Sequence, residues 1–134
     1  MGDKPKSTIV PRIKKNILVI EDESITATSI CESLNRSGYR TIAALNSRDA
    51  LEIGQSEKID LIISDIRLDS EDSITGIEAA QTICKFKGYI PILVMSGFST
   101  KNIDVNVQGA VGFLTKPLDL DVLPRIVQLI FKEI

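Results

Sequence analysis

The stretch Ile17-Leu-Val-Ile-Glu-Asp-Glu23 joins four consecutive apolar residues directly to three acidic ones. Apolar residues in unbroken succession, without polar residues in alternation, are typical of a strand buried on both faces, as in a parallel sheet covered by helices. Similar short runs recur along the chain, and we expect strands over residues 17–20, 41–44, 61–63, 90–95 and 112–114. The sequence therefore predicts a five-stranded parallel sheet.

Segments with helical periodicity lie between these runs. Three of them carry clear apolar stripes: Ala27, Ile30, Cys31 and Leu34; Ile77, Ala80, Ile83 and Cys84; and Leu123, Val127 and Ile130. We expect Gly38 to end the first helix and Ser47 to be the N-cap of the second. Asp121 as the N-cap of the last helix would place Pro124 in the first turn, where its missing N–H is not needed. A further helix is expected within residues 100–108.

Five β-α units imply a parallel sheet with right-handed crossovers and helices on both faces, which is a three-layer, doubly wound α/β fold. With 134 residues and 43% hydrophobic residues, the chain is large enough for one such domain, which we place over residues 16–134. Residues 1–15 carry five basic residues against Asp3. We interpret them as a flexible basic arm or linker; the alternative is a segment that binds an anionic surface or partner.

Composition excludes several classes of function. The chain has no histidine, which excludes histidine-based nucleophilic catalysis, histidine-liganded zinc and a phosphohistidine of its own. A net charge of -2 argues against nucleic-acid binding. No apolar run suits a membrane span or a signal peptide, so we expect no membrane association and a cytoplasmic location. Cys31 and Cys84 lie on apolar stripes and are expected to be small hydrophobic residues of the interior.

Polar side chains follow four of the predicted strands. Glu21, Asp22 and Glu23 follow the first, Asp65 the third, Ser96 the fourth, and Lys116-Pro117 the fifth. Because the carboxyl ends of parallel strands meet at one edge of the sheet, we expect these residues to converge. Carboxylates brought together repel one another unless a cation lies among them, and Mg²⁺ prefers such oxygen ligands. The hydroxyl and the ammonium group suit the charge of a phosphoryl group.

Each of these residues also has a purely structural interpretation. Asp22 or Ser24 could be the N-cap of the following helix. Ser96 alone is typical of a turn, Lys116-Pro117 alone is a common surface dipeptide, and Phe113 alone is typical of a core. Asp65 is different because it ends an apolar run, where an unpaired carboxylate would be costly to bury. The functional interpretation is therefore favoured for Asp65 from its position alone.

Four segments together resemble the receiver domains of two-component response regulators. They are Ile17-Leu-Val-Ile-Glu-Asp-Glu23, Leu61-Ile-Ile-Ser-Asp-Ile-Arg-Leu68, Ile90-Pro-Ile-Leu-Val-Met-Ser-Gly97 and Gly109-Ala-Val-Gly-Phe-Leu-Thr-Lys-Pro117. Each segment alone is weak evidence, but the four occur in the family's order and at nearly its spacing, over residues 15–134. The resemblance implies a flavodoxin-like (βα)5 fold with strand order 2-1-3-4-5.

The resemblance also implies a role for each matching residue. Asp65 would be the phosphoacceptor. The metal would be held by Glu21 (mostly through water), Asp22, Asp65 and the backbone carbonyl of Arg67. Ser96 and Lys116 would bind phosphoryl oxygens, with a cis peptide bond between Lys116 and Pro117. Ser96 and Phe113 would form the switch, which reshapes the face made by the fourth helix, the fifth strand and the fifth helix.

The implied cofactor is Mg²⁺, with Mn²⁺ as a substitute. The implied partners are a histidine kinase or phosphotransfer protein as donor and a downstream protein target or output domain. The resemblance implies no enzyme activity beyond self-phosphorylation from the donor and autodephosphorylation. A stand-alone regulator and a domain of a larger regulator or hybrid kinase both fit.

The sequence departs from the family in three places. The segment from Asp65 to Gly76 is longer than usual and acidic, Ser96 is followed by Gly97 rather than alanine, and the stretch from Ser96 to Lys116 is short. We therefore expect a short or irregular fourth helix and do not carry over a family-type dimer. The alternatives are a pseudo-receiver that binds partners without phosphorylation, and a flavodoxin-like ligand binder or metal-dependent phosphatase. Glu-Asp-Glu after the first strand argues against flavin binding, and Arg67 argues against a dedicated phosphatase.

Overall fold

The computed structural model describes residues 13–66, 75–97 and 109–133. In chain order these residues form β1 (Asn16–Ile20), α1 (Ser24–Arg36), β2 (Arg40–Ala44), α2 (Ser47–Ser56), β3 (Leu61–Asp65), α3 (Gly76–Lys87), β4 (Ile92–Ser96), β5 (Ala110–Thr115) and α4 (Leu123–Glu133). Every predicted strand is present, although β4 begins two residues later than expected. The helix expected within residues 100–108 lies outside the described residues, and α4 is the helix that the sequence predicted last.

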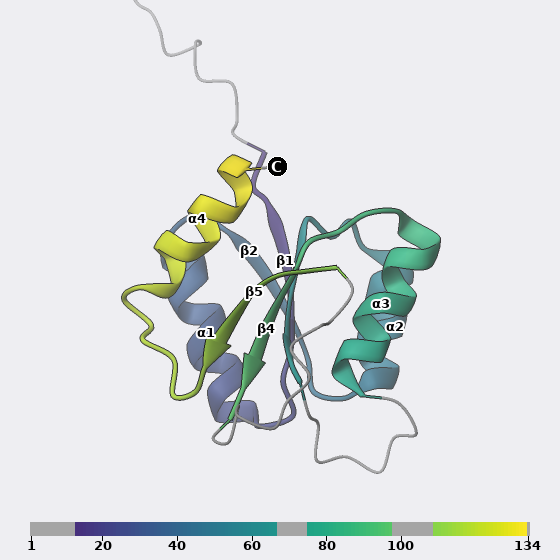
Figure 1. Cartoon of the computed structure of the whole chain (residues 1–134), viewed down its shortest axis with the longest axis horizontal. Coiled ribbons are helices and arrows are strands. Elements are labelled where there is room, and N and C mark those ends of the chain that lie inside the picture. The colour runs from purple at the N-terminus through teal and green to yellow at the C-terminus, as the bar shows by residue number, and fades with distance from the viewer. Residues whose placement is uncertain (1–12, 67–74, 98–108, 134) are drawn as a thin grey trace, which may run out of the picture.

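The five strands form one parallel sheet with the order β2-β1-β3-β4-β5. Of the described helices, α1 and α4 lie on one side of the sheet, and α2 and α3 lie on the other (Figure 1). The predicted three-layer, doubly wound α/β fold and its strand order are therefore confirmed. None of the helices over the described ranges is long and apolar enough to cross a membrane.

The apolar runs of the inner strands supply both halves of the core. In β1, Leu18 and Ile20 point to the side of α2 and α3, whereas Ile17 and Val19 point to the side of α1 and α4. All four side chains are fully buried. Burying a side chain of this kind stabilises the fold by about 1.5–3 kcal/mol. The unbroken apolar character of β1 thus follows from its place between two helical layers.

The helix ends show which residues cap the helices. Helix α1 ends as predicted before Gly38, whose φ of 97° lies in the left-handed region that glycine favours. The prediction of Ser47 as N-cap was wrong, because the Asn46 side chain accepts from the Asp49 N–H at 2.8 Å and Ser47 is the first helical residue. Asn and Ser are both good N-cap residues. The helix begins one residue earlier than predicted, so Asn46 occupies the N-cap position.

The start of α4 also differs from the prediction. Pro124 is the second residue of α4 and so lies in its first turn, as expected. Asp121 precedes the helix by two residues and is not its N-cap. Instead, the carboxylate of Asp119 accepts a hydrogen bond from the N–H of Asp121 at 3.0 Å. An extra turn held by Asp119 therefore comes before the helix.

Candidate functional site

The carboxyl ends of β1, β3, β4 and β5 bring the predicted polar residues to one edge of the sheet. Glu21 follows β1 directly, and Asp65 and Ser96 are the last residues of β3 and β4. Lys116 follows β5, two strands away from β3. Its backbone N–H donates to the carbonyl of Ser96 at 2.7 Å, which ties the two strand ends together. The peptide bond from Lys116 to Pro117 is cis.

The Lys116 side chain reaches across the end of β4 and contacts two carboxylates. Its Nζ donates to Oδ2 of Asp65 at 2.6 Å and also to Oε1 of Glu21. Glu21 is 1% exposed and Asp65 is 7% exposed. Two nearly buried carboxylates therefore share one ammonium group, which offsets part of the cost of removing them from water.

Three acidic residues of this edge lie close enough to share one cation. Glu21, the half-buried Asp22 and Asp65 each offer a carboxylate oxygen, and these oxygens lie within 4.8 Å of one another. An all-oxygen donor set with two or three carboxylates fits Mg²⁺, which binds carboxylates and retains several waters. Arg67, whose backbone carbonyl was predicted as a further ligand, lies outside the described residues.

Burial and charge perturb two groups of the site. Burial raises the pKa of Glu21, and the negative charge of Asp65 adds to this, while hydrogen bonds from Lys116 and from the Glu23 N–H act against it. For Lys116, burial by itself would lower the pKa, but the hydrogen bonds and charges of Asp65 and Glu21 together outweigh it and raise the pKa. The ammonium form of Lys116 is thus favoured by its two acidic neighbours.

The start of α1 orients the Glu21 side chain through a backbone contact. The sequence predicted Glu21 as a site residue but did not predict this contact. The N-cap of α1 is Glu23, not Asp22 or Ser24, and it makes no side-chain capping bond. Its backbone N–H donates to Oε2 of Glu21 at 3.0 Å, while Thr26 donates to the Glu23 side chain. Glu21 is therefore held by the backbone N–H of Glu23 on one oxygen and by Lys116 on the other. A carboxylate two residues before the N-cap of a helix was the available signal.

The two residues predicted to form the switch have different environments. Ser96 is buried at the end of β4. Phe113 belongs to β5, pairs with Val94 and is 42% exposed. The alternative interpretation of Phe113 as a core residue is therefore wrong. The large aromatic ring of Phe113 is thus partly exposed to solvent on the strand that leads to Lys116.

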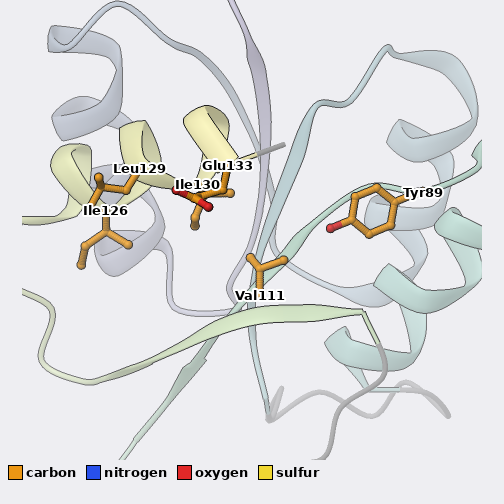
Figure 2. Close-up of a pocket in the computed structure, with 6 residues that line it drawn as sticks. All are labelled: Tyr89, Val111, Ile126, Leu129, Ile130 and Glu133. Carbon is orange, nitrogen blue, oxygen red and sulfur yellow. The ribbon is translucent and has the colours of Figure 1, made fainter.

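An apolar hollow lies beside β5, between this strand and α4 (Figure 2). Its volume is about 430 Å³, and Ile126, Leu129, Ile130 and Glu133 of α4 line one side. Val111 of β5 and Tyr89 complete the lining, and the Tyr89 ring lies across from α4 in Figure 2. None of the predicted site residues within the described part of the chain lines this hollow, which is therefore separate from the acidic cluster.

The comparisons with known proteins agree with this geometry. A family model described as response regulator receiver domain matches residues 17–128. The transcriptional regulatory protein ZraR of Klebsiella oxytoca is 36% identical over 110 residues, which cover 81% of this chain and 24% of ZraR. PdtaR of Mycobacterium tuberculosis is 30% identical over 118 residues, which cover 85% of this chain and 56% of PdtaR. The chain thus spans about a quarter to about half of these relatives.

Solved structures show the same relationship. TrrA from Thermotoga maritima, in complex with Mg²⁺-BeF, is 30% identical with a TM-score of 0.73, and the match covers 86% of this chain and 97% of that one. A CheY-like receiver domain protein from Methanospirillum hungatei is 21% identical with a TM-score of 0.77, covering 90% and 96% of the two chains, and shows the shared fold. Since the family model matches most of its length, the chain belongs to the response regulator receiver domain family.

Proposed function

We propose that Asp65 is the phosphoacceptor of this receiver domain. The observation that carries this proposal is the position of its carboxylate, which ends a buried strand, lies 2.6 Å from Lys116 Nζ and has two further acidic side chains beside it. Receiver domains are the signalling phosphoacceptors of two-component systems. Among the described residues, Glu21 and Asp65 both combine burial, a contact with Lys116 and neighbouring carboxylates, and of these two Asp65 is the last residue of a strand.

The proposed reaction transfers a phosphoryl group from a phosphohistidine of a partner protein. A carboxylate oxygen of Asp65 attacks the phosphorus, and the P–N bond to the donor imidazole breaks. The imidazole nitrogen keeps the bonding electrons and takes up a proton, and an acyl phosphate forms on Asp65. The donor histidine lies outside this sequence, which contains none.

Glu21, Asp22 and Asp65 would hold Mg²⁺, or Mn²⁺ in its place, with the Arg67 carbonyl as a further proposed ligand. The bound cation supplies positive charge that offsets the negative charge of the transferring phosphoryl oxygens. Lys116 then exchanges its contact with Asp65 for a phosphoryl oxygen, and the Ser96 hydroxyl donates to another. The chain's own part is to orient the acceptor and to place one ammonium group and one hydroxyl around it.

We further propose that the output passes through β5 and α4. Phe113 would move when Ser96 is drawn toward the phosphoryl group, and the apolar hollow beside Val111 lies on the same strand. The downstream partner would be a protein target or an output domain. The cytoplasmic location, the absence of further enzyme activity and the assignment of residues 1–15 as a linker stay predictions of the sequence.

The proposal is tested by measuring intact mass after incubation with a small-molecule phosphodonor and Mg²⁺. We expect one hydroxylamine-labile phosphoryl adduct on the wild type, none on Asp65→Asn, and none when Mg²⁺ is chelated. An equal adduct on Asp65→Asn would disprove the assignment of the acceptor. No adduct on a wild type that binds Mg²⁺ and is also inert toward phosphohistidine proteins would favour the pseudo-receiver alternative.

A further inference from the structure

We propose that Gly76 is a positioning residue for the acceptor, an inference that rests on the proposed function of Asp65. Gly76 is the first residue of α3 and is buried against the end of β3. A Cβ atom at this position would lie 2.7 Å from Ser64 Oγ, 3.0 Å from the backbone oxygen of Asp65 and 3.3 Å from Ile20 Cγ2. The missing side chain lets α3 start in direct contact with the backbone of the acceptor.

The strand side of this contact has little freedom to retreat. β3 is hydrogen-bonded between β1 and β4, and the N–H of Ile66 donates to the Met95 carbonyl at 2.8 Å. Ser64 is fully buried, and its hydroxyl donates to the same Asp65 carbonyl at 3.0 Å. A methyl group at residue 76 would press on this hydroxyl and on this carbonyl together.

The helix side is also held. Thr75 and Glu78 form a capping box: the Glu78 N–H donates to Thr75 Oγ1 at 3.0 Å, and the Thr75 N–H donates to Glu78 Oε1 at 2.8 Å. The same turn therefore fixes where residue 76 lies. Since both sides are held, an added methyl would be accommodated by a small displacement of the α3 start and of the Asp65 backbone together.

A displacement of the Asp65 backbone would move its carboxylate, which lies 2.6 Å from Lys116 Nζ. Group transfer depends strongly on the position of the attacking atom, and a misplacement of about 1 Å costs on the order of 100-fold in rate. Gly76 would thus act on phosphorylation through the Asp65 backbone, without touching the phosphoryl group itself.

Two other glycines provide matched controls for Gly76→Ala. A Cβ at Gly97, the residue after Ser96, meets no atom within 4 Å, so Gly97→Ala adds a methyl near the site without a clash. A Cβ at Gly54 would lie 2.5 Å from Ile83 Cγ1, where α2 packs on α3, so Gly54→Ala disturbs packing away from the site. Gly97→Ala tests whether any added methyl group near the site lowers the rate. Gly54→Ala tests whether a loss of protein stability by itself lowers the rate.

The experiment measures the limiting phosphorylation rate at saturating small-molecule donor and Mg²⁺, at a temperature where circular dichroism shows each variant to be folded. We expect Gly76→Ala to lower this rate by about 10-fold or more. We expect Gly97→Ala, and Gly54→Ala despite its lower melting temperature, to stay within about twofold of the wild type. A Gly76→Ala rate within the range of the two controls would overturn the inference. Failure of the wild type to react would count against the proposed function instead.

A double variant keeps the test decisive if Gly76→Ala is too unstable to assay. Ser64→Ala with Gly76→Ala removes the hydroxyl at 2.7 Å but leaves the contact with the Asp65 carbonyl. We expect it to recover melting temperature without recovering rate, while Ser64→Ala alone stays close to the wild type. Recovery of the wild-type rate in the double variant would show that contact with the Asp65 carbonyl does not position the acceptor.

Discussion

Strands β3 and β5 each bring one charged residue to the site, but their surroundings differ. All five residues of β3, Leu61–Asp65, are buried, and the strand has hydrogen-bonded neighbours on both sides. β5, Ala110–Thr115, is the last strand of the sheet, and half-buried residues alternate with exposed ones along it. Its register with β4 is also irregular near Ile92 and Leu93.

This difference in burial suggests different roles for β3 and β5. The proposed acceptor Asp65 ends a strand whose residues are all buried, where local opening is rare. Phe113 belongs to the last strand of the sheet, which has exposed side chains, and Lys116 follows this strand directly. A change of position there costs less than in β3. We infer that the site consists of a fixed acceptor and a movable responding side.

The largest expected effect comes from shortening a side chain of β3. Ile63 is fully buried, so Ile63→Ala should lower the free energy of unfolding by about 2–5 kcal/mol. Val111 of β5 is 43% exposed, so Val111→Ala should change it by about 0.5 kcal/mol or less. Urea unfolding of both variants checks this. Equal losses would contradict the comparison between the strands.

The next effect concerns Lys116, the side chain that joins the two strands. Lys116→Met leaves Glu21 and Asp65 without their shared cation and should destabilise the protein by about 1–3 kcal/mol, a value reduced because the lysine is 23% exposed. Added Mg²⁺ should then raise the melting temperature of this variant more than that of the wild type, because it supplies the missing charge.

Lys87→Met is the matched control, since Lys87 donates to the exposed Glu57 carbonyl and is remote from the carboxylates. It should leave both stability and the response to Mg²⁺ unchanged. If Lys116→Met responded to Mg²⁺ no more than Lys87→Met does, the shared ion pair would not be the source of the effect.

A smaller effect is expected for the responding side alone. Phe113→Ala removes the half-exposed ring of β5 without touching the acidic cluster, so the phosphorylation rate should stay within about threefold of the wild type. The changes in amide chemical shift on phosphorylation should be lost along α4 and retained around β3. Retained shifts in α4 would mean that another residue carries the response.

The smallest effect concerns the far end of α4. Phe131 packs on Tyr39 with ring centroids 5.7 Å apart, which fixes the end of the helix to the body of the protein. Burial raises the pKa of Tyr39 above its ordinary value of 10.0. Above this pH the unfolded chain loses the tyrosine proton first, so the free energy of unfolding should fall as pH rises.

In Tyr39→Phe this contribution disappears. Its free energy of unfolding should fall less steeply above pH 10 than that of the wild type, and the difference between the two proteins cancels the other groups that titrate there. Urea unfolding at a series of pH values measures it. Parallel curves would show that the Tyr39 hydroxyl is not buried in this packing.

The sequence predicted β1, β3 and β4 well because these strands are buried on both faces. Such strands have unbroken apolar runs, which can be recognised in each segment by itself. The convergence of Glu21, Asp65 and Lys116 followed from the parallel order of the strands. The double contact of Lys116 did not, because it depends on a side chain that crosses the end of a neighbouring strand. The N-cap at Asn46 was missed because two capable residues are adjacent. The close approach of Gly76 to Asp65 depends on packing between α3 and β3. The residues next to Gly76 in the sequence do not indicate this contact.

The measurement that tests the central claim most directly is chemical location of the phosphoryl group. Borohydride reduces an aspartyl phosphate to homoserine, which peptide mass spectrometry detects at a single position. After phosphorylation with a small-molecule donor and Mg²⁺, we predict homoserine at residue 65 and at no other acidic position of the cluster. Homoserine at residue 22, 2-amino-5-hydroxyvaleric acid (the reduction product of a glutamyl phosphate) at residue 21, or an adduct that borohydride does not convert at residue 65, would contradict the assignment of Asp65 as the acceptor.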